Sequence, residues 1–354
     1  MPLPKKNVDD QPLKPLQSLY ESVRQTSVPL PEPLLKQIRT CILSKSSNAE
    51  TVRFTNDDNS STLLNSILET AATPSLPYQH RALAADTLSA WLIRSKMYPA
   101  LQRPLGAAHG TDVWLRICQL VLDNFDDAST ALAKALKDLL ANALSTVGTG
   151  TKRGKEVMQW MAASALQGIN VGEGRKGGYY SLDVALRKGV GAEWVFGEYR
   201  RITASSASQE GGGRLVEDLL RNLEDRNLCP SIGKACVSLL AARRKEIMVS
   251  RAPELEWVGV WDGPLRRSLQ NEELRTRVQI YILPGLFKES AVCFGKFVND
   301  IGYAQFTGAP GAAAQQKMSE EELGSLLCCL SVGKDLGFVG DVGKQILRSP
   351  GTIS

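Results

Sequence analysis

The chain has 354 residues, of which 43% are hydrophobic and 22% are charged, values close to the averages of folded globular proteins. This composition excludes a wholly disordered chain and a collagen-like chain, and no run of about 18 apolar residues predicts a membrane span. Lys and Arg number 42 against 37 Asp and Glu, and the net charge of +5 permits contact with nucleic acid without requiring it.

The N-terminal residues give no sign of a secretory signal. Lys5, Lys6, Asp9 and Asp10 are not followed by the apolar segment that a signal peptide needs. The seven cysteines show no C-x-x-C spacing, as expected of small apolar residues in a reducing compartment. We therefore expect a cytoplasmic protein with free cysteines, no membrane segment and no zinc site.

Apolar residues recur at helical spacing along most of the chain. Between Leu132 and Ala143 they occupy positions i, i+3, i+4, i+7, i+8 and i+11, which form one side of a helix. Similar patterns begin at Ala84, Val157, Ile232 and Leu274. Because no convincing alternation of apolar and polar residues occurs, the predicted fold class is all-α.

The spacing of helix starts predicts a repeat architecture. Starts near Gly211, Cys229, Pro253, Asn271 and Phe287 lie about 16 to 24 residues apart. A pair of helices therefore spans about 40 residues, as in HEAT and armadillo repeats. One helix pair cannot bury its own apolar face, so we expect an α-solenoid of stacked antiparallel pairs, with about 13 to 16 helices.

Composition predicts the breaks in this array. We expect a disordered N-terminus at 1–11 and a helical-repeat array at 12–306. Loops are predicted near 44–61 and 204–213, where Ser, Asn and Gly are frequent, and a Gly/Ala/Gln linker is predicted at 307–317. Further helices at 318–354 would end as a truncated array, since no polar capping helix follows.

Enzyme chemistry has little support in the sequence. Gly172, Gly174 and Gly177 match G-x-G-x-x-G, but an amphipathic helix precedes them where a dinucleotide site needs a strand, so a basic interhelical loop is predicted. The two histidines, His80 and His109, are expected at helix caps or on the surface, and no G-x-S-x-G elbow occurs. We predict no catalytic residues, no metal and no cofactor.

Basic residues flank a helix predicted at 156–168, and they are the candidates for RNA binding. The first group comprises Lys152, Arg153 and Lys155, before the helix, and the second comprises Arg175 and Lys176, in the loop after it. One interpretation is that they are solvated charges at helix ends, where cations complement the carbonyl end of the dipole. The other is contact with RNA phosphates, with Lys155 and Lys176 on one track if the two loops share a rim.

The tyrosines after the second basic group, and the later basic pairs, also permit either a structural role or contact with RNA. Tyr179 and Tyr180 follow the second group and could stack on bases, although core packing is expected for at least one of them. Further basic pairs are predicted at later helix ends: Arg200-Arg201, Arg243-Arg244-Lys245 and Arg266-Arg267.

Three segments between about residues 63 and 303 resemble the N-terminal region of fungal members of the THADA family. They are Arg175-Lys176-Gly177-Gly178-Tyr179-Tyr180-Ser181-Leu182-Asp183-Val184, Asn227-Leu228-Cys229-Pro230-Ser231-Ile232-Gly233-Lys234 and Tyr281-Ile282-Leu283-Pro284-Gly285-Leu286-Phe287-Lys288. The glycine doublet Gly177-Gly178 departs from the family pattern, where a small residue such as Ala is expected after Gly. Family members are much longer, so we expect an N-terminal part of such a protein.

The resemblance implies a function. THADA-family proteins are large helical-repeat proteins that serve as the non-catalytic partner of an FtsJ-type tRNA ribose 2′-O-methyltransferase. The resemblance implies a scaffold for modification of the tRNA anticodon loop, with S-adenosylmethionine bound by the partner. The alternative is a HEAT/armadillo-type protein–protein adaptor with no RNA role, in which the basic pairs are only solvated.

Overall fold

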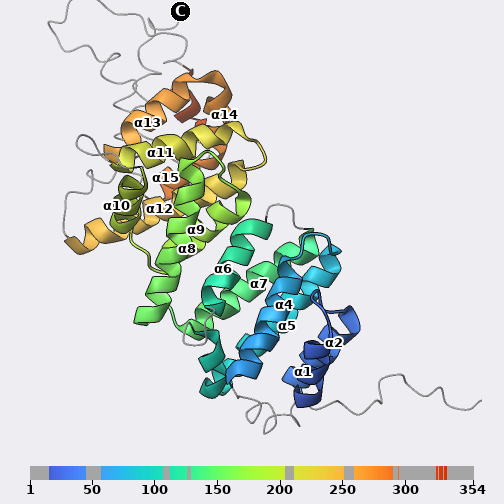
Figure 1. Cartoon of the computed structure of the whole chain (residues 1–354). Coiled ribbons are helices and arrows are strands. Elements are labelled where there is room, and N and C mark those ends of the chain that lie inside the picture. The colour runs from blue at the N-terminus through green and yellow to red at the C-terminus, as the bar shows by residue number, and fades with distance from the viewer. Residues whose placement is uncertain are drawn as a thin grey trace, which may run out of the picture. The chain divides into compact units, whose positions relative to one another are not determined.

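The structure is a computed structural model, and it is all helical where it is described (Figure 1). It describes residues 16–44, 57–106, 112–125, 129–203, 211–250, 259–289, 294, 324–325, 327–329 and 331–332. These residues form fourteen α-helices and two 3₁₀ helices, and none of them forms a strand. The all-α prediction is therefore confirmed.

The chain divides into two compact units, Met1–Trp160 and Met161–Ser354, and the division falls within one helix, α8 (Lys152–Asn170). The other helices of the first unit are α1 (Leu16–Gln25), α2 (Glu32–Leu43), α4 (Asp57–Ala72), α5 (Tyr78–Met97), η2 (Pro99–Leu105), α6 (Val113–Asn124) and α7 (Thr130–Val147). Those of the second unit are α9 (Lys176–Arg187), α10 (Ala192–Ile202), α11 (Gly211–Arg221), η4 (Asn222–Glu224), α12 (Cys229–Ser250), α13 (Gly259–Gln270), α14 (Glu272–Tyr281) and α15 (Leu283–Glu289).

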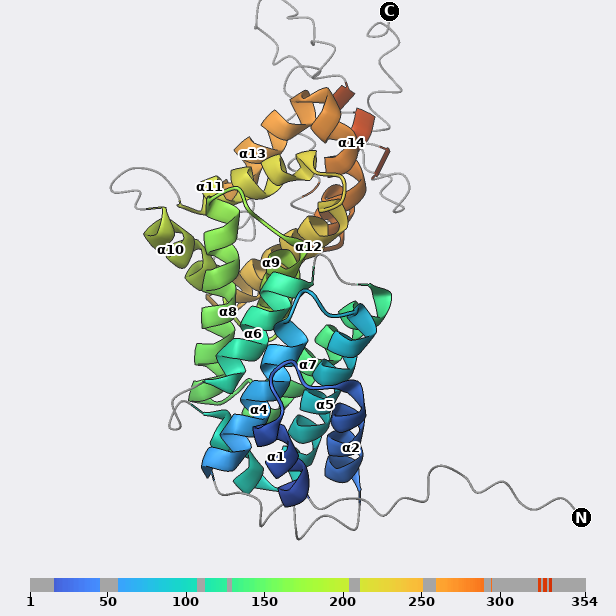
Figure 2. The ribbon, with the colours of Figure 1, turned by 45° about the vertical axis from the view of Figure 1, so that its right-hand side comes forward.

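The first unit is built from two layers of helices (Figure 2). One layer contains α1, α4 and α6, and the other contains α2, α5 and α7, with α5 in contact with both of its neighbours. Hydrogen bonds join the C-terminal halves of α5 and α7: Thr146 Oγ1 donates to the Leu92 carbonyl at 3.4 Å, and Lys96 Nζ donates to Asn142 Oδ1 at 3.3 Å. These two helices therefore run in the same direction, as equivalent helices of successive repeats do.

The predicted apolar stripes form the core of the first unit. On α7, all the stripe residues from Leu132 to Ala143 are buried. On α5, the indole of Trp91 is fully buried, and its Nε1 donates to the Leu101 carbonyl at 3.1 Å. Each fully buried large side chain contributes roughly 1.5–3 kcal/mol relative to an exposed one, so these stripes hold the two layers together.

The second unit contains the three segments that resemble the THADA family. Asp183, in the first segment on α9, accepts a hydrogen bond at 2.6 Å from Ser238 Oγ on α12, four residues after the second segment. Gly233 on α12 lies so close to Tyr281 on α14 that a Cβ built on it would be 3.0 Å from the Tyr281 Cβ. The second and third segments therefore pack against each other, and the first is bonded to the helix that carries the second.

Three element boundaries differ from the predictions. Helix α8 covers 152–170 rather than 156–168, because Thr151 caps its first turn by accepting a hydrogen bond from the Gly154 amide at 3.0 Å. Helix α4 begins inside the loop predicted at 44–61, and α11 begins inside the one predicted at 204–213. Residues 1–11 and 307–317, predicted as a disordered end and a linker, lie outside the described residues.

A candidate nucleic-acid interface

The five predicted RNA-binding residues lie at the N-terminal ends of two helices. Lys152, Arg153 and Lys155 occupy the first turn of α8, where no acidic residue is present. Arg175 lies in the loop after α8, as predicted, and is the N-cap residue of α9, whereas Lys176 is the first residue of α9 rather than a loop residue. The N-terminal end of a helix is the positive end of its dipole. Dipole complementarity therefore does not explain these cations.

Four of these five side chains are available to an external anion. Lys152, Lys155 and Arg175 are exposed, and Lys176 is half-buried. Within the described part of the chain, no carboxylate forms an ion pair with any of the four. Free backbone amides in a first helical turn also attract anions, so cations and amides at the same place favour phosphate.

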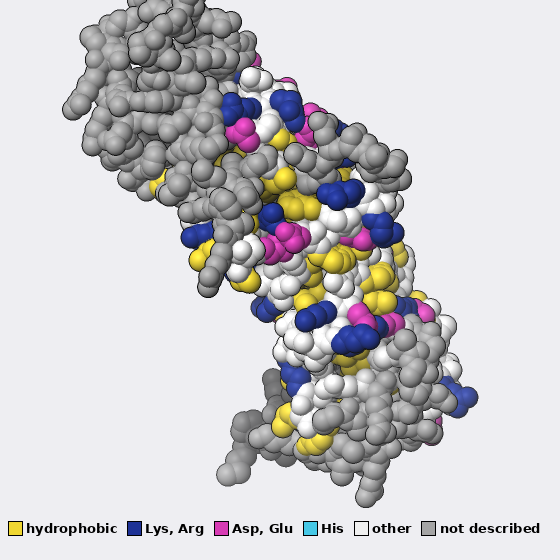
Figure 3. All heavy atoms as spheres, turned by 90° about the vertical axis from the view of Figure 1, so that its left-hand side faces the viewer, with side chains coloured by type: hydrophobic (Ala, Val, Ile, Leu, Met, Phe, Trp, Pro, Cys, Tyr) yellow, Lys and Arg dark blue, Asp and Glu magenta, His cyan; other side chains and the backbone are white. Residues whose placement is uncertain are grey.

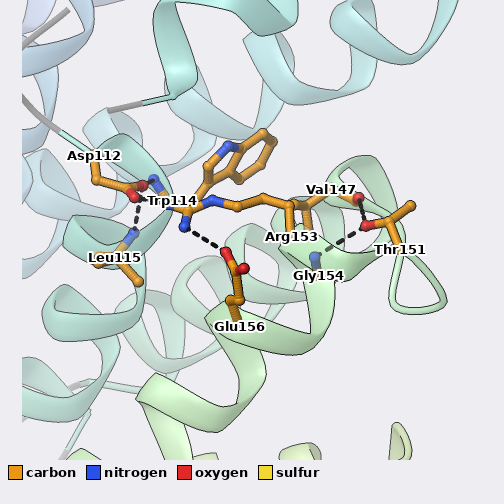
Figure 4. Close-up of polar contacts among 8 residues, drawn as sticks. All are labelled: Asp112, Trp114, Leu115, Val147, Thr151, Arg153, Gly154 and Glu156. Carbon is orange, nitrogen blue, oxygen red and sulfur yellow. Dashed lines mark hydrogen bonds and ion pairs between the residues drawn. The ribbon is translucent and has the colours of Figure 1, made fainter. Parts of the chain in front are cut away.

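Arg153 has a different role, because it connects two helices of the first unit (Figure 4). Its guanidinium forms an ion pair with the Asp112 carboxylate, and its Nη1 contacts Glu156 Oε2 at 3.1 Å. Asp112 is the N-cap of α6 and accepts hydrogen bonds from the Trp114 amide at 3.1 Å and the Leu115 amide at 3.3 Å. Arg153 therefore fixes the start of α8 against the start of α6, and two carboxylates neutralise its charge.

Because Arg153 is ion-paired and Lys155 has no ion pair among the described residues, alanine substitutions at these two residues should change the free energy of unfolding by different amounts. Arg153→Ala should lower the free energy of unfolding by about 1 kcal/mol, because the Asp112 side chain is only 13% exposed and loses its ion-pair partner. Lys155→Ala, at an exposed position with no ion pair, should change it by less than about 0.5 kcal/mol. Urea unfolding of both variants tests this, and equal curves would contradict the connecting role of Arg153.

The two basic groups belong to different units. Lys152, Arg153 and Lys155 lie in the first unit, and Arg175 and Lys176 lie in the second. The structure thus forms two separate groups of cations, one at each end of α8. The shared track for Lys155 and Lys176 stays a prediction.

Tyr179 is a core residue. Its side chain is fully buried, and its hydroxyl accepts a hydrogen bond from Asn222 Nδ2 at 2.8 Å. A Cβ on Gly174 would collide with this hydroxyl, so the turn before α9 needs glycine there. Tyr180 is half-buried. Core packing of at least one of the two tyrosines is therefore confirmed.

Two further cations lie at the same edge of the second unit as Arg175 and Lys176. Helices α9 and α12 run in the same direction. Ser238 on α12 donates a hydrogen bond to Asp183 on α9. Farther along α12, the Glu246 carboxylate accepts a hydrogen bond from the amide of Glu193, which lies beyond the end of α9. Their N-terminal ends therefore lie side by side. The exposed Arg226 lies in the turn before α12, and the exposed Lys234 lies in the second turn of α12. Sequence reasoning missed them because only the pairing of α9 with α12 places them near residue 175.

The later basic pairs are largely neutralised. Ion pairs join Arg201 to Glu198 at 2.5 Å, Arg243 to Glu193 at 2.6 Å, Arg244 to Glu289 at 3.8 Å, Arg266 to Asp262 at 3.2 Å, and Arg267 to Glu217. On the face drawn in Figure 3, Lys and Arg side chains are interspersed with Asp and Glu. That face is not one continuous basic surface, so RNA affinity would come from small groups of cations.

Other kinds of site find no support in the described residues. Gly172 has a φ of +74° and turns the chain between α8 and α9, with a helix rather than a strand before it, as predicted. His80 Nε2 lies 2.7 Å from the Leu30 carbonyl, while His109 falls outside the described ranges. Burial raises the pKa of the Cys118 and Cys236 thiols to about 12, which disfavours a nucleophilic thiolate.

The described residues contain no group of three or more His, Cys, Asp or Glu side chains that could hold a metal ion. Among them, no helix has both the length and the apolar character needed to cross a membrane.

Comparison with known proteins gives one match. Residues 257–351 match the family model described as "Trm732, TPR repeats". The matched segment includes α13, α14 and α15 and contains the third segment of the THADA resemblance, at 281–288. Repeats of this type are helical hairpins, in agreement with the helices described there. No curated protein and no solved structure matches the chain.

Proposed function

We propose that this chain is a non-catalytic helical-repeat subunit of a cytoplasmic assembly that modifies tRNA. In this proposal, the chain binds tRNA and holds it for an FtsJ-type 2′-O-methyltransferase, which acts on a ribose of the anticodon loop. The partner binds S-adenosylmethionine, and this chain binds no cofactor.

The observation that carries the RNA-binding part is the placement of Lys152, Lys155, Arg175 and Lys176. Each stands in or beside the first turn of a helix without an ion pair among the described residues. The positive end of a helix dipole repels cations that lie beside it, and a bound phosphate offsets this repulsion. RNA supplies phosphates at regular intervals, so a chain with two such groups can contact one RNA at several points.

The match to the Trm732-type model supports tRNA modification as the setting. The resemblance of the three segments to the THADA family supports the same setting and supplies the FtsJ-type partner. A scaffold that leaves catalysis to an enzyme partner fits this chain. Its glycine motif follows a helix rather than a strand, and its described cysteines are buried or half-buried.

One mixture of purified chain, unmodified tRNA and S-adenosylmethionine tests this function. We expect an electrophoretic shift of the tRNA that weakens steeply between about 50 and 200 mM salt, because phosphate contacts release counterions. We expect a 2′-O-methyl nucleotide only after an FtsJ-type methyltransferase is added. Absence of salt-dependent binding would favour the protein–protein adaptor, and a methylated product from the chain alone would contradict the non-catalytic role.

A further inference from the structure

Four basic residues of the second unit lie along one edge of the pair formed by α9 and α12, and we call this surface the α9–α12 edge. Arg175 and Lys176 come from α9 and the turn before it, and Arg226 and Lys234 come from α12 and the turn before it. All four belong to one compact unit. The fold therefore fixes where their backbones stand relative to one another.

Lys176 and Lys234 lie on the sides of α9 and α12 that face each other. Ser238 on α12 donates a hydrogen bond to Asp183 on α9 at 2.6 Å. Lys176 precedes Asp183 by seven residues and Lys234 precedes Ser238 by four, so each lysine shares a helix side with one end of that bond. At a rise of about 1.5 Å per residue they lie about 10 Å and about 6 Å before the bond, on packed helices about 8–10 Å apart. Two flexible lysine side chains at these positions can reach neighbouring phosphates of one strand.

The turn that carries Arg226 is held beside the turn that carries Arg175. Asn222 Nδ2, in η4, donates a hydrogen bond to the Tyr179 hydroxyl at 2.8 Å. The same hydroxyl lies so close to Gly174 that a Cβ built there would overlap it. Residues 174 and 222 therefore contact one hydroxyl group from two turns. Basic residues on fixed turns lose less freedom when they bind a ligand than residues on mobile segments do.

The cations of the α9–α12 edge are not used to hold the unit together. Three exposed carboxylates lie in the same two turns, those of Glu173, Glu224 and Asp225. Among the described residues, none of the three forms an ion pair with a cation of the edge. Asp225 Oδ1 instead accepts a hydrogen bond from the Asn227 amide at 2.8 Å. The four cations are therefore available to an external anion, and the carboxylates between them restrict where that anion can lie.

We propose that the α9–α12 edge contacts the sugar–phosphate backbone of RNA, with Arg226 and Lys234 as contact residues beside Arg175 and Lys176. This inference rests on the proposed function, which supplies RNA as the occupant. RNA carries one negative charge per nucleotide, and that spacing suits cations spread over two helices and two turns. Backbone contacts position a nucleic acid without reading its sequence. The edge thus fixes how the tRNA lies on the chain, and not which sequence is bound.

The double variant Arg226→Ala with Lys234→Ala tests the proposal in the full chain. We expect the slope of log K against log salt to become shallower by about 1.4–1.8 and tRNA affinity at physiological salt to fall at least about fivefold. Fluorescence anisotropy of labelled tRNA measures both. Arg226→Lys with Lys234→Arg keeps the two charges and should keep the wild-type slope. Both side chains are exposed, so urea unfolding of either variant should match that of the wild type.

The matched control removes two charges from the C-terminal parts of the same helices. Lys188→Ala with Lys245→Ala changes the net charge equally, and both side chains are exposed. It should bind tRNA with the affinity and slope of the wild type. Equal losses in the two alanine variants, or wild-type binding by Arg226→Ala with Lys234→Ala, would overturn the proposal and leave the proposed function standing.

Two further outcomes are distinct from these. A labelled deca-glutamate peptide that loses affinity in Arg226→Ala with Lys234→Ala, while tRNA binding is unchanged, would assign the edge to an acidic protein segment and overturn the RNA contact. Absence of tRNA binding by the wild type would overturn both this inference and the proposed function.

Discussion

Replacing Lys152, Lys155, Arg175 and Lys176 together with alanine should weaken tRNA binding at least about tenfold at physiological salt. Each lost phosphate contact removes about 0.7 to 0.9 from the slope of log K against log salt, so the slope should become shallower by about 3. Arg153 is retained in this variant because it pairs with Asp112 and Glu156 inside the first unit. Fluorescence anisotropy of labelled tRNA, measured at several salt concentrations, gives both quantities.

A control of equal charge separates specific contacts from general attraction. Four exposed cations away from the two helix starts are replaced with alanine: Arg24, Lys188, Arg200 and Lys245. The net charge changes by the same amount in both variants, so an effect of net charge alone would be the same. We expect the control to keep most of the wild-type affinity and slope. Equal losses in the two variants would show that the helix starts are not the RNA contacts.

Gly285→Ala should lower the free energy of unfolding by about 1–3 kcal/mol, the usual cost of overpacking. A Cβ at position 285 on α15 would overlap Cγ2 of Val237 on α12. Valine has a stiff χ1 and cannot turn its methyl group away at low cost, so the two helices would have to separate. Helix propensity alone would predict the opposite, a gain in stability, because it favours Ala over Gly by roughly 0.5–1 kcal/mol.

The double variant Val237→Ala with Gly285→Ala tests the cause of this loss. Removing the Val237 methyl groups makes room for the new Cβ, so the two changes should be non-additive by about 1 kcal/mol or more. Gly197→Ala on α10 is the matched control, because a Cβ there meets no atom within 4 Å. It should raise stability slightly. Urea unfolding of the wild type, Val237→Ala, Gly285→Ala, the double variant and the control decides the matter, and additive effects would rule out the steric explanation.

Much of the fold could be predicted because helical periodicity is a local property. The stripe from Leu132 to Ala143 identifies the buried side of α7 from the sequence alone. Boundaries are less predictable, because the charged residues before 156 add nothing to the apolar stripe that predicts the helix at 156–168. The threonine cap at Thr151 is the local signal that could have placed the start of α8 correctly.

The candidate site was predictable only in part, because long-range pairing decides the role of each cation. Lys155 and Arg153 are two residues apart and look equivalent in the sequence. Only the fold brings Asp112 to Arg153, and only the fold places Lys234 at the same edge as Lys176.

The packing of α9, α14 and α15 against α12 has a consequence for the evolution of such chains. Gly233 contacts Tyr281, Gly285 approaches Val237, and Asp183 accepts a hydrogen bond from Ser238. A substitution at one member of such a contact is therefore tolerated most easily when its partner changes too. Related chains should vary at these contact positions in pairs.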